Sequence, residues 1–267
     1  MTFLDVATLN IWHDSGPWPQ RCELILEEMS RLKPDLVGLQ EVLCQPDGRG
    51  QAEELAGPLG YEVVYAPASR RSDGAWLGNA LLSRLPVRRS ETVALPADGV
   101  EPRSMLYALV DTVDGELPVF VTHLAWEPDL GAVRGRQVDA ILERIEWSVA
   151  DLPAAPEPAL EKALPCLLMG DFNAAPDADE LLPLEDGWVD AWSVAGDGPG
   201  FMFDPENGYA RPWEEPAQRI DYLFVEADPR VRVHLAETAF TVPRLVDGQP
   251  TWPSDHYGIA CRLELRA

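Results

Sequence analysis

Short apolar runs recur along almost the whole chain, and few helical patterns separate them. Strands are predicted where these runs lie, at 3–12, 35–39, 61–66, 78–83, 91–95, 105–111, 117–123, 166–169, 219–226, 231–236 and 257–265. Helices are predicted around 22–32, 52–59 and 138–149, where apolar residues repeat every three or four positions. Many strands with few helices between them fit α/β or α+β layering with two packed sheets better than a barrel of alternating units.

Two segments interrupt this pattern. The segment 150–165 is rich in proline, and we predict that it is a surface connection inside one domain. The segment 196–216 is rich in Gly, Pro, Trp and acidic residues without a sustained period, which predicts a long loop of the kind that carries specificity. No internal repeat is visible, and residues 1–267 are expected to form a single domain.

The charge of the chain limits its partners. It has 267 residues, of which 46% are apolar, so it can bury a substantial core. Its 45 acidic and 21 basic residues give a net charge of −24. Extended duplex DNA is therefore disfavoured, because proteins hold it mainly through Lys and Arg on the phosphates. A phosphate ester that is reached through metal ions remains compatible with this charge.

The compartment is predicted from what the sequence lacks. No stretch has the length of an apolar membrane span, and the first residues lack a basic flank before an apolar core. A cytoplasmic protein is expected, although a mature secreted form would look the same. Cys22, Cys44, Cys166 and Cys261 form no CxxC pair and are expected to be reduced thiols, the last two buried. We expect a monomer.

Polar residues follow the predicted strands and are the types that metal-assisted phosphoryl chemistry uses. Asn10 closes the first strand and Glu41 follows the second, so an amide and a carboxylate meet if the strands are neighbours. Oxygen ligands of this kind are what Mg²⁺ prefers. Each residue also has a simpler interpretation, because Asn at a strand end is often a turn residue and a lone Glu is usually solvated.

Two further motifs are stronger. In 168–173, LMGDFN, an apolar strand opens into Asp171 and Asn173, which point the same way and either hold a water or metal or close a local turn. In 254–256, SDH, a carboxylate stands beside the imidazole of His256. His123 and Asp221 lie at the ends of two other strands. An Asp bonded to a histidine fixes its tautomer and favours its charged form.

Together these motifs resemble the endonuclease/exonuclease/phosphatase superfamily, which includes deoxyribonuclease I, abasic-site endonucleases, neutral sphingomyelinases and inositol polyphosphate 5-phosphatases. The matches run in family order: TLN at 8–10, PDLVGLQEV at 34–42, GNALLSRLP at 78–86, VTHL at 121–124, GDFN at 170–173, RIDY at 219–222 and SDH at 254–256. The resemblance implies a four-layered α/β/β/α sandwich with two packed mixed sheets and a site at one edge.

The resemblance also implies a metal site. Glu41 would be the main Mg²⁺ ligand, with Asn10 assisting it and Asp255 as a ligand or a contact behind the ligands. Mn²⁺ or Ca²⁺ are alternatives to Mg²⁺. The reaction implied is an in-line displacement at phosphorus by water, in a phosphodiester or phosphomonoester.

Five more residues receive roles from the resemblance. Asp171 would orient and activate the water, and Asn173 would hold the same water or the phosphate. His256, paired with Asp221, would touch a non-bridging phosphate oxygen as a charged donor or as a base. His123 would donate to the phosphate or act as general acid, and a His at this position separates the chain from abasic-site endonucleases, which carry Tyr there.

Arg103 and the tryptophans bear on the substrate. Arg103, in an acidic-x-Arg element with Glu101, either reaches the substrate phosphate or is a surface residue paired with Glu101. Tryptophans near the proposed site either stack on a base, line a lipid groove or pack the rim, and they are Trp12, Trp76, Trp126, Trp213 and Trp252.

Three functions therefore remain open. A Mg²⁺-dependent phosphohydrolase for a small or lipid-like substrate is favoured, a metal-dependent nuclease acting on DNA or RNA is the alternative, and a catalytically silent binding module is the least favoured. Sequence alone does not name the substrate.

Overall fold

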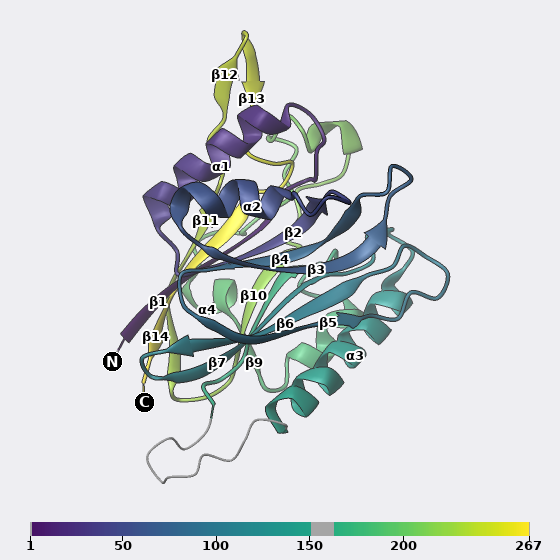
Figure 1. The fold of residues 1–267 in the computed structure, drawn as a ribbon. Coiled ribbons are helices and arrows are strands. Elements are labelled where there is room, and N and C mark those ends of the chain that lie inside the picture. The colour runs from purple at the N-terminus through teal and green to yellow at the C-terminus, as the bar shows by residue number, and fades with distance from the viewer. Residues whose placement is uncertain (1, 151–162, 267) are drawn as a thin grey trace.

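Two six-stranded sheets form the centre of the computed structural model, which describes residues 2–150 and 163–266 (Figure 1). In spatial order, the first sheet contains β11 (Val231–Ala239), β14 (Gly258–Leu265), β1 (Thr2–Asn10), β2 (Leu36–Cys44), β4 (Trp76–Ser83) and β3 (Glu62–Arg70). The second contains β5 (Val87–Ala94), β6 (Ser104–Thr112), β7 (Gly115–His123), β8 (Leu167–Asp171), β10 (Asp221–Glu226) and β9 (Trp188–Asp190).

Helices cover the outer faces of both sheets. α1 (Trp18–Leu32) and α2 (Gln51–Ala56) pack on the first sheet, and α3 (Gly131–Ala150) packs on the second (Figure 1). Apolar clusters fill each interface: Ile25 and Met29 of α1 pack with β1 and β2, and Ile141 of α3 packs with β7 and β8. A third cluster lies between the sheets. The four-layered α/β/β/α sandwich of two mixed sheets is thereby confirmed.

Parallel pairing in each sheet directs strand ends to one edge of the sandwich. β1 and β2 are parallel in the first sheet, and β7 and β8 are parallel in the second. Their connections run through α1 and α3, as a parallel pair requires. Because ligands of such sheets bind beyond the carboxyl ends of the strands, the residues that end these four strands define where a site is expected.

Most predicted strands and helices are present, with altered ends. β2 continues to Cys44 instead of ending at position 39, and the second predicted helix is shorter, because α2 ends at Ala56 and a 3-10 turn follows. The first strand ends at Asn10, since Trp12 has a left-handed φ of 55°. All four cysteines are free, and Cys166 and Cys261 are buried as expected.

Three elements were not predicted, and one predicted segment lies mostly outside the described residues. The sequence did not indicate β9, α4 (Ala191–Ala195) or the projecting hairpin of β12 (Arg244–Val246) and β13 (Gln249–Thr251). The segment 196–216 is mainly loop, as predicted. Most of the predicted connection at 150–165 lies outside the described residues. None of the helices in 2–150 and 163–266 is long and apolar enough to span a membrane.

Substitutions of Gly38 and Met169 can test the packing between the two sheets. A Cβ at Gly38 would lie 2.6 Å from the Sδ of Met169 on the opposite sheet. We expect Gly38→Ala to lower the free energy of unfolding by about 1–3 kcal/mol through overpacking, and Met169→Ala to lower it by about 2–5 kcal/mol through a cavity. The double variant should lose less than the sum, because each change relieves the other.

Urea unfolding of the three variants measures this coupling. Gly135→Ala is the control, because Gly135 lies inside α3 and the added Cβ would make only an ordinary contact, at 3.9 Å, with the Cβ of Glu180. It should leave stability unchanged or raise it slightly. Strict additivity of Gly38→Ala and Met169→Ala would contradict the close approach of the two sheets.

Candidate active site

Polar side chains at the ends or starts of five strands meet at one edge of the sandwich. Asn10 ends β1, His123 ends β7 and Asp171 ends β8, where His123 and Asp171 are directly paired in register. Asp221 begins β10, which is antiparallel to β8, and it pairs with Asp171. His256 lies just before β14, whose start reaches the same edge because β14 is antiparallel to β1.

Asn10 connects the two sheets at this edge. Its Nδ2 donates to Oδ2 of Asp171 at 2.9 Å and to Oε1 of Glu41 at 3.3 Å. Its Oδ1 accepts from the N–H of Trp12 at 3.0 Å. Asn10 therefore holds two carboxylates here, and the metal-ligand role predicted for it would require its oxygen to face the site. Glu41 and Asp171 therefore converge on one amide and do not point apart.

A local irregularity turns Glu41 toward the site. The pairing of β2 with β4 shifts register between Leu39 and Val42, and Glu41 has a left-handed φ of 57°. A non-glycine residue in this region costs about 1–3 kcal/mol and persists only where neighbours fix it. The bulge re-aims the Glu41 carboxylate, as bulges beside functional sites do.

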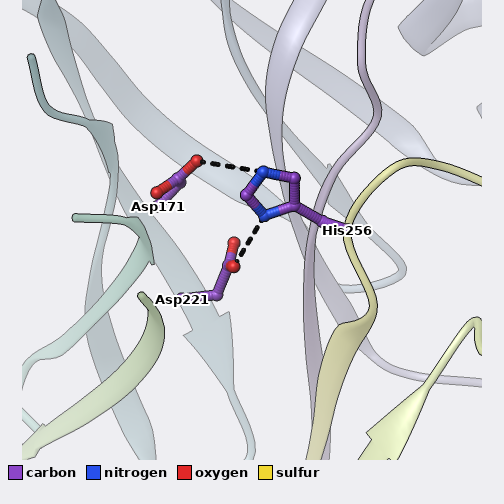
Figure 2. A group of neighbouring side chains, drawn as sticks. All are labelled: Asp171, Asp221 and His256. Carbon is purple, nitrogen blue, oxygen red and sulfur yellow. Dashed lines mark hydrogen bonds and ion pairs between the residues drawn. The ribbon is translucent and has the colours of Figure 1, made fainter. Parts of the chain in front are cut away.

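His256 and Asp221 form a buried pair (Figure 2). Nδ1 of His256 lies 2.8 Å from Oδ2 of Asp221, and Nε2 lies 3.8 Å from Oδ2 of Asp171. Burial disfavours a charge on His256, but the carboxylates of Asp221 and Asp171 outweigh burial and raise its pKa well above the usual value. The ring is therefore an imidazolium that Asp221 orients.

His123 has the opposite electrostatic setting. Its Nε2 lies 3.0 Å from Nδ2 of Asn173 and 3.5 Å from Oδ2 of Asp171, while its Nδ1 lies 3.4 Å from Nη1 of Arg103. Burial, followed by the positive charges of Arg103 and His256, lowers the pKa of His123 well below its usual value. The site thus contains one charged and one neutral imidazole.

Asp255 completes an excess of negative charge beside Glu41. It is buried, and its Oδ1 lies 3.2 Å from the hydroxyl of Ser254. Burial and then the charge of Glu41 raise the pKa of Asp255 to about 7, against the opposing effect of His256. Two carboxylates that repel each other in a buried site fit a divalent cation, and an oxygen-only donor set suits Mg²⁺ better than a transition metal.

A second group of potential ligands lies close by. Ligand atoms of Asp171, Asp221 and His256 all lie within 4.8 Å of one another. The short His256–Asp221 contact occupies one atom of each residue, so a cation there would have to replace the shared proton. We therefore regard this group as a proton-holding pair beside a carboxylate.

Arg103 lies in a small cavity at the same edge. Glu41, His123 and Asn79 also line it. Arg103 is 5% exposed and forms an ion pair with Glu101 at 3.3 Å, so it is neither a surface residue nor unpaired. Its buried Nε and the buried Oδ1 of Asn79 have no hydrogen-bond partner. Buried unpaired polar atoms beside a cavity suit a polar ligand such as phosphate.

Arg21 supports the site and was not singled out from the sequence. It is fully buried, and its Nη1 donates to the carbonyl oxygens of Ile11 at 2.7 Å and Pro253 at 3.0 Å. It therefore joins the segment after Asn10 to the segment before Asp255. The spacing of Arg21 to Ile25 and Met29 at four-residue steps places it on the apolar face of α1, which is the sequence signal for its burial.

His13 is a second residue near the site that no sequence motif marks. Its Nε2 lies 3.9 Å from Oε2 of Glu41, and its backbone carbonyl accepts from Nη2 of Arg21 at 2.7 Å. His13 has a left-handed φ of 34°. Only the position of His13 three residues after Asn10 indicated that it would be near the site.

The tryptophans divide into separate groups. Trp12 and Trp252 pack on the ring of Tyr209 at centroid distances of 5.0 and 5.7 Å, which is rim packing. Trp126 and Trp213 contact each other at 6.3 Å and remain exposed. The five residues thus form no continuous aromatic surface.

Comparison with known proteins identifies the family. The model of the Endonuclease/Exonuclease/phosphatase family matches residues 7–256. The chain belongs to this family. Protein angel of Drosophila melanogaster is 25% identical to it over 249 residues, covering 84% of this chain and 63% of the fly protein. This chain therefore spans less than two thirds of that relative's length.

Solved structures share the fold. An endonuclease/exonuclease/phosphatase from Bacteroides vulgatus has a TM-score of 0.76 and 22% identity, and the match covers 100% of both chains. TDP2 from D. rerio, in complex with a single-strand DNA product, has a TM-score of 0.75 and 19% identity, covering 99% of this chain and 100% of that one. The activities in the name of this Endonuclease/Exonuclease/phosphatase family all hydrolyse phosphoric esters.

The opposite charge states of the two histidines lead to a titration prediction. In metal-free protein, the ring of His256 should titrate well above pH 6.5 and that of His123 well below it. Asp221→Asn should lower the pKa of His256, because it removes the carboxylate that favours the imidazolium. The pKa values of both histidines can be measured from their Cε1–H NMR shifts in EDTA. Single histidine variants assign each signal.

Asp197→Asn, on the exposed surface, is the control and should leave both titrations unchanged. If both rings titrate together near pH 6.5 in wild-type protein, the assignment of one charged and one neutral imidazole is wrong.

Proposed function

We propose that this chain is a phosphoric ester hydrolase in which water attacks phosphorus with the help of a divalent cation. The observation that carries the proposal is the position of Asp171 between two imidazoles of opposite charge state. Oδ2 of Asp171 lies 3.5 Å from Nε2 of His123 and 3.8 Å from Nε2 of His256. Groups whose pKa values are pushed apart in this way are typical of acid and base partners in catalysis.

Asp171 is the residue that would orient the water and accept its proton. Asn10 donates to its Oδ2, and the backbone N–H of Asn173 donates to its Oδ1 at 2.9 Å, so the carboxylate cannot rotate freely. The local turn considered from the sequence is thus present, and it also restrains the carboxylate of Asp171. Asn173 would hold the same water or the phosphate through its amide.

The two imidazoles would stabilise the negative charge that develops on the phosphate oxygens. His256 does so as a charged donor, because Asp221 holds the proton on Nδ1 and leaves Nε2–H for the substrate. Both ring nitrogens of His123 face donors, Arg103 at Nδ1 and the amide of Asn173 at Nε2, and Oδ2 of Asp171 lies 3.5 Å from Nε2. We propose the tautomer with the proton on Nε2, because Asp171 is the acceptor among these contacts. We therefore assign His123 as a neutral donor and not as the general acid.

Glu41 and Asp255 would hold the cation. Their mutual repulsion and the burial of Asp255 fit this role, while Asn10 holds Glu41 in place and Arg21 fixes the backbone on both sides. When bound, the cation supplies Lewis-acid stabilisation of phosphate charge. We propose Mg²⁺, since the donors are oxygens, with Mn²⁺ or Ca²⁺ as substitutes.

The substrate is proposed to be a compact phosphate ester. The net charge of −24 opposes a long polyanion gripped along its backbone, and Arg103 offers one cation to one phosphate. Hydrolysis of a nucleic-acid strand is the second candidate, because TDP2 of the same fold is complexed with a single-strand DNA product. We propose one catalytic domain, since the proposed site draws on residues from Asn10 to His256.

Replacement of Glu41 or Asp255 should weaken binding of the cation. Glu41→Gln and Asp255→Asn each remove an anionic oxygen, and we expect the Kd for Mn²⁺ to rise by more than about tenfold, since even the outer partners of metal ligands are worth about 10–100-fold. Calorimetric titration measures the Kd for Mn²⁺ and does not depend on enzymatic turnover.

Glu185→Gln, at an exposed position outside the site, is the control and should bind Mn²⁺ as the wild type does. Loss of binding in Asp221→Asn with normal binding in both Glu41→Gln and Asp255→Asn would move the cation to the Asp171, Asp221 and His256 group.

Removal of the proposed water-activating or charged group should abolish turnover. On a panel of phosphomonoesters, phosphodiesters and single-stranded oligonucleotides, wild-type protein should hydrolyse at least one member in Mg²⁺ and none in EDTA. Asp171→Asn and His256→Gln should each lower kcat by about 10²–10⁴-fold, the range for a positioned proton-transfer or charge-stabilising group.

Asp197→Asn serves again as the matched control and should retain full activity. A decrease below tenfold in Asp171→Asn or His256→Gln would refute the role of that residue, and no turnover of any panel member by the wild type would refute the proposed function.

A further inference from the structure

Two exposed tryptophans from separate loops contact each other. Trp126 and Trp213 are 47% and 51% exposed, and their ring centroids are 6.3 Å apart with planes inclined at 65°. An edge-to-face pair gains from the contact itself, but it leaves large aromatic surfaces in water. Neither tryptophan has been given a function in the proposed site.

Trp126 follows His123 on a rigid backbone. The carbonyl oxygen of Leu124 accepts from Nδ2 of Asn173 at 3.3 Å. Next to it, the buried Arg134 donates from Nη1 to the carbonyl of Ala125 at 3.1 Å and to that of Glu127 at 2.9 Å. The indole is therefore presented from a fixed loop that begins at one proposed catalytic histidine.

Trp213 is connected to the other histidine. The backbone N–H of Trp213 donates to the carbonyl of Ala210 at 3.1 Å, and Ala210 packs in a small buried cluster with Phe203. The ring of Phe203 lies 5.2 Å from the ring of His256, and Nδ2 of Asn207 donates to the carbonyl of Ser254 at 2.8 Å. The loop that carries Trp213 is thus anchored beside His256.

The charge around the pair narrows what it can contact. Glu127, Asp129, Glu214 and Glu215 flank the tryptophans, and the nearby Arg211 donates from Nε to a backbone carbonyl. These acidic residues would repel an anionic lipid surface. A nucleobase is neutral at pH 7, has an apolar face, and stacks on exposed aromatic rings without a basic partner.

We propose that the Trp126–Trp213 pair binds the nucleobase of a nucleotide-containing phosphate ester whose phosphate lies at Asp171. This inference rests on the proposed function and names its substrate class. The phosphate would meet the two histidines, and each of the two loops that leave them would bring one indole to the base. Sequence-tolerant stacking of this kind contributes about 5- to 150-fold in affinity per base.

The test compares binding of AMP and ribose 5-phosphate by calorimetric titration in Mg²⁺. The two probes share the phosphate and the sugar, so their ratio of Kd values isolates the base. Wild-type protein should bind AMP at least about fivefold more tightly. Trp126→Ala and Trp213→Ala should reduce the preference to below twofold, and Trp126→Phe should restore part of it.

Trp147→Ala is the matched control, because Trp147 is 67% exposed on α3 and should leave the preference unchanged. Thermal melting confirms that each variant is folded, and Trp213→Ala serves if Trp126→Ala is not. Equal binding of the two probes by the wild type, or a full preference in both alanine variants, overturns the inference. Phosphate release and ester hydrolysis, assayed separately, report on the proposed function independently of this preference.

Discussion

The hydrogen bonds from one amide of Asn10 join the two sheets at the edge where the site residues meet. Asp171 lies on the second sheet and Glu41 on the first, and both carboxylates accept from the same Nδ2. This bridge requires the sheets to approach closely, which the absence of a side chain at Gly38 opposite Met169 allows. It also requires both parallel strand pairs to end at the same edge, because only then do their terminal residues face one another.

The electrostatics of the site follow from this convergence. Four carboxylates and two imidazoles are brought into a buried region where charges interact strongly. His256 lies against two of the carboxylates and becomes charged, whereas His123 lies beside Arg103 and His256 and becomes neutral. Burial and the nearby carboxylate of Glu41 raise the pKa of Asp255, and a bound cation would relieve this repulsion. Identical side-chain types thus receive different tasks from their neighbours.

Much of this arrangement could be predicted from the sequence because it depends on local pattern. Apolar runs that end in Asn10, His123 and Asp171 locate the strand ends, and the motif order indicates the four-layered fold. The loop at 196–216 was predictable from its composition in the same way.

Other features depend on contacts between distant segments, which no local pattern records. The bulge that turns Glu41 arises from pairing with β4, and the role of Arg21 depends on carbonyl groups before and after it in the chain, including that of Pro253. The contact of Trp126 with Trp213 likewise joins two loops. The hairpin of β12 and β13 is too short for its alternation to be distinguished from a loop.

The central claim is that carboxyl ends of parallel strands position a phosphate between one charged and one neutral imidazole, with a cation beside it. A crystal structure with Mg²⁺ and a phosphonate analogue tests it most directly. The account predicts oxygens of Glu41 and Asp255 on the cation, and phosphonate oxygens within hydrogen-bond distance of Nε2 of both His123 and His256. A cation seated on Asp221 and His256, or a phosphonate that contacts neither imidazole, would contradict it.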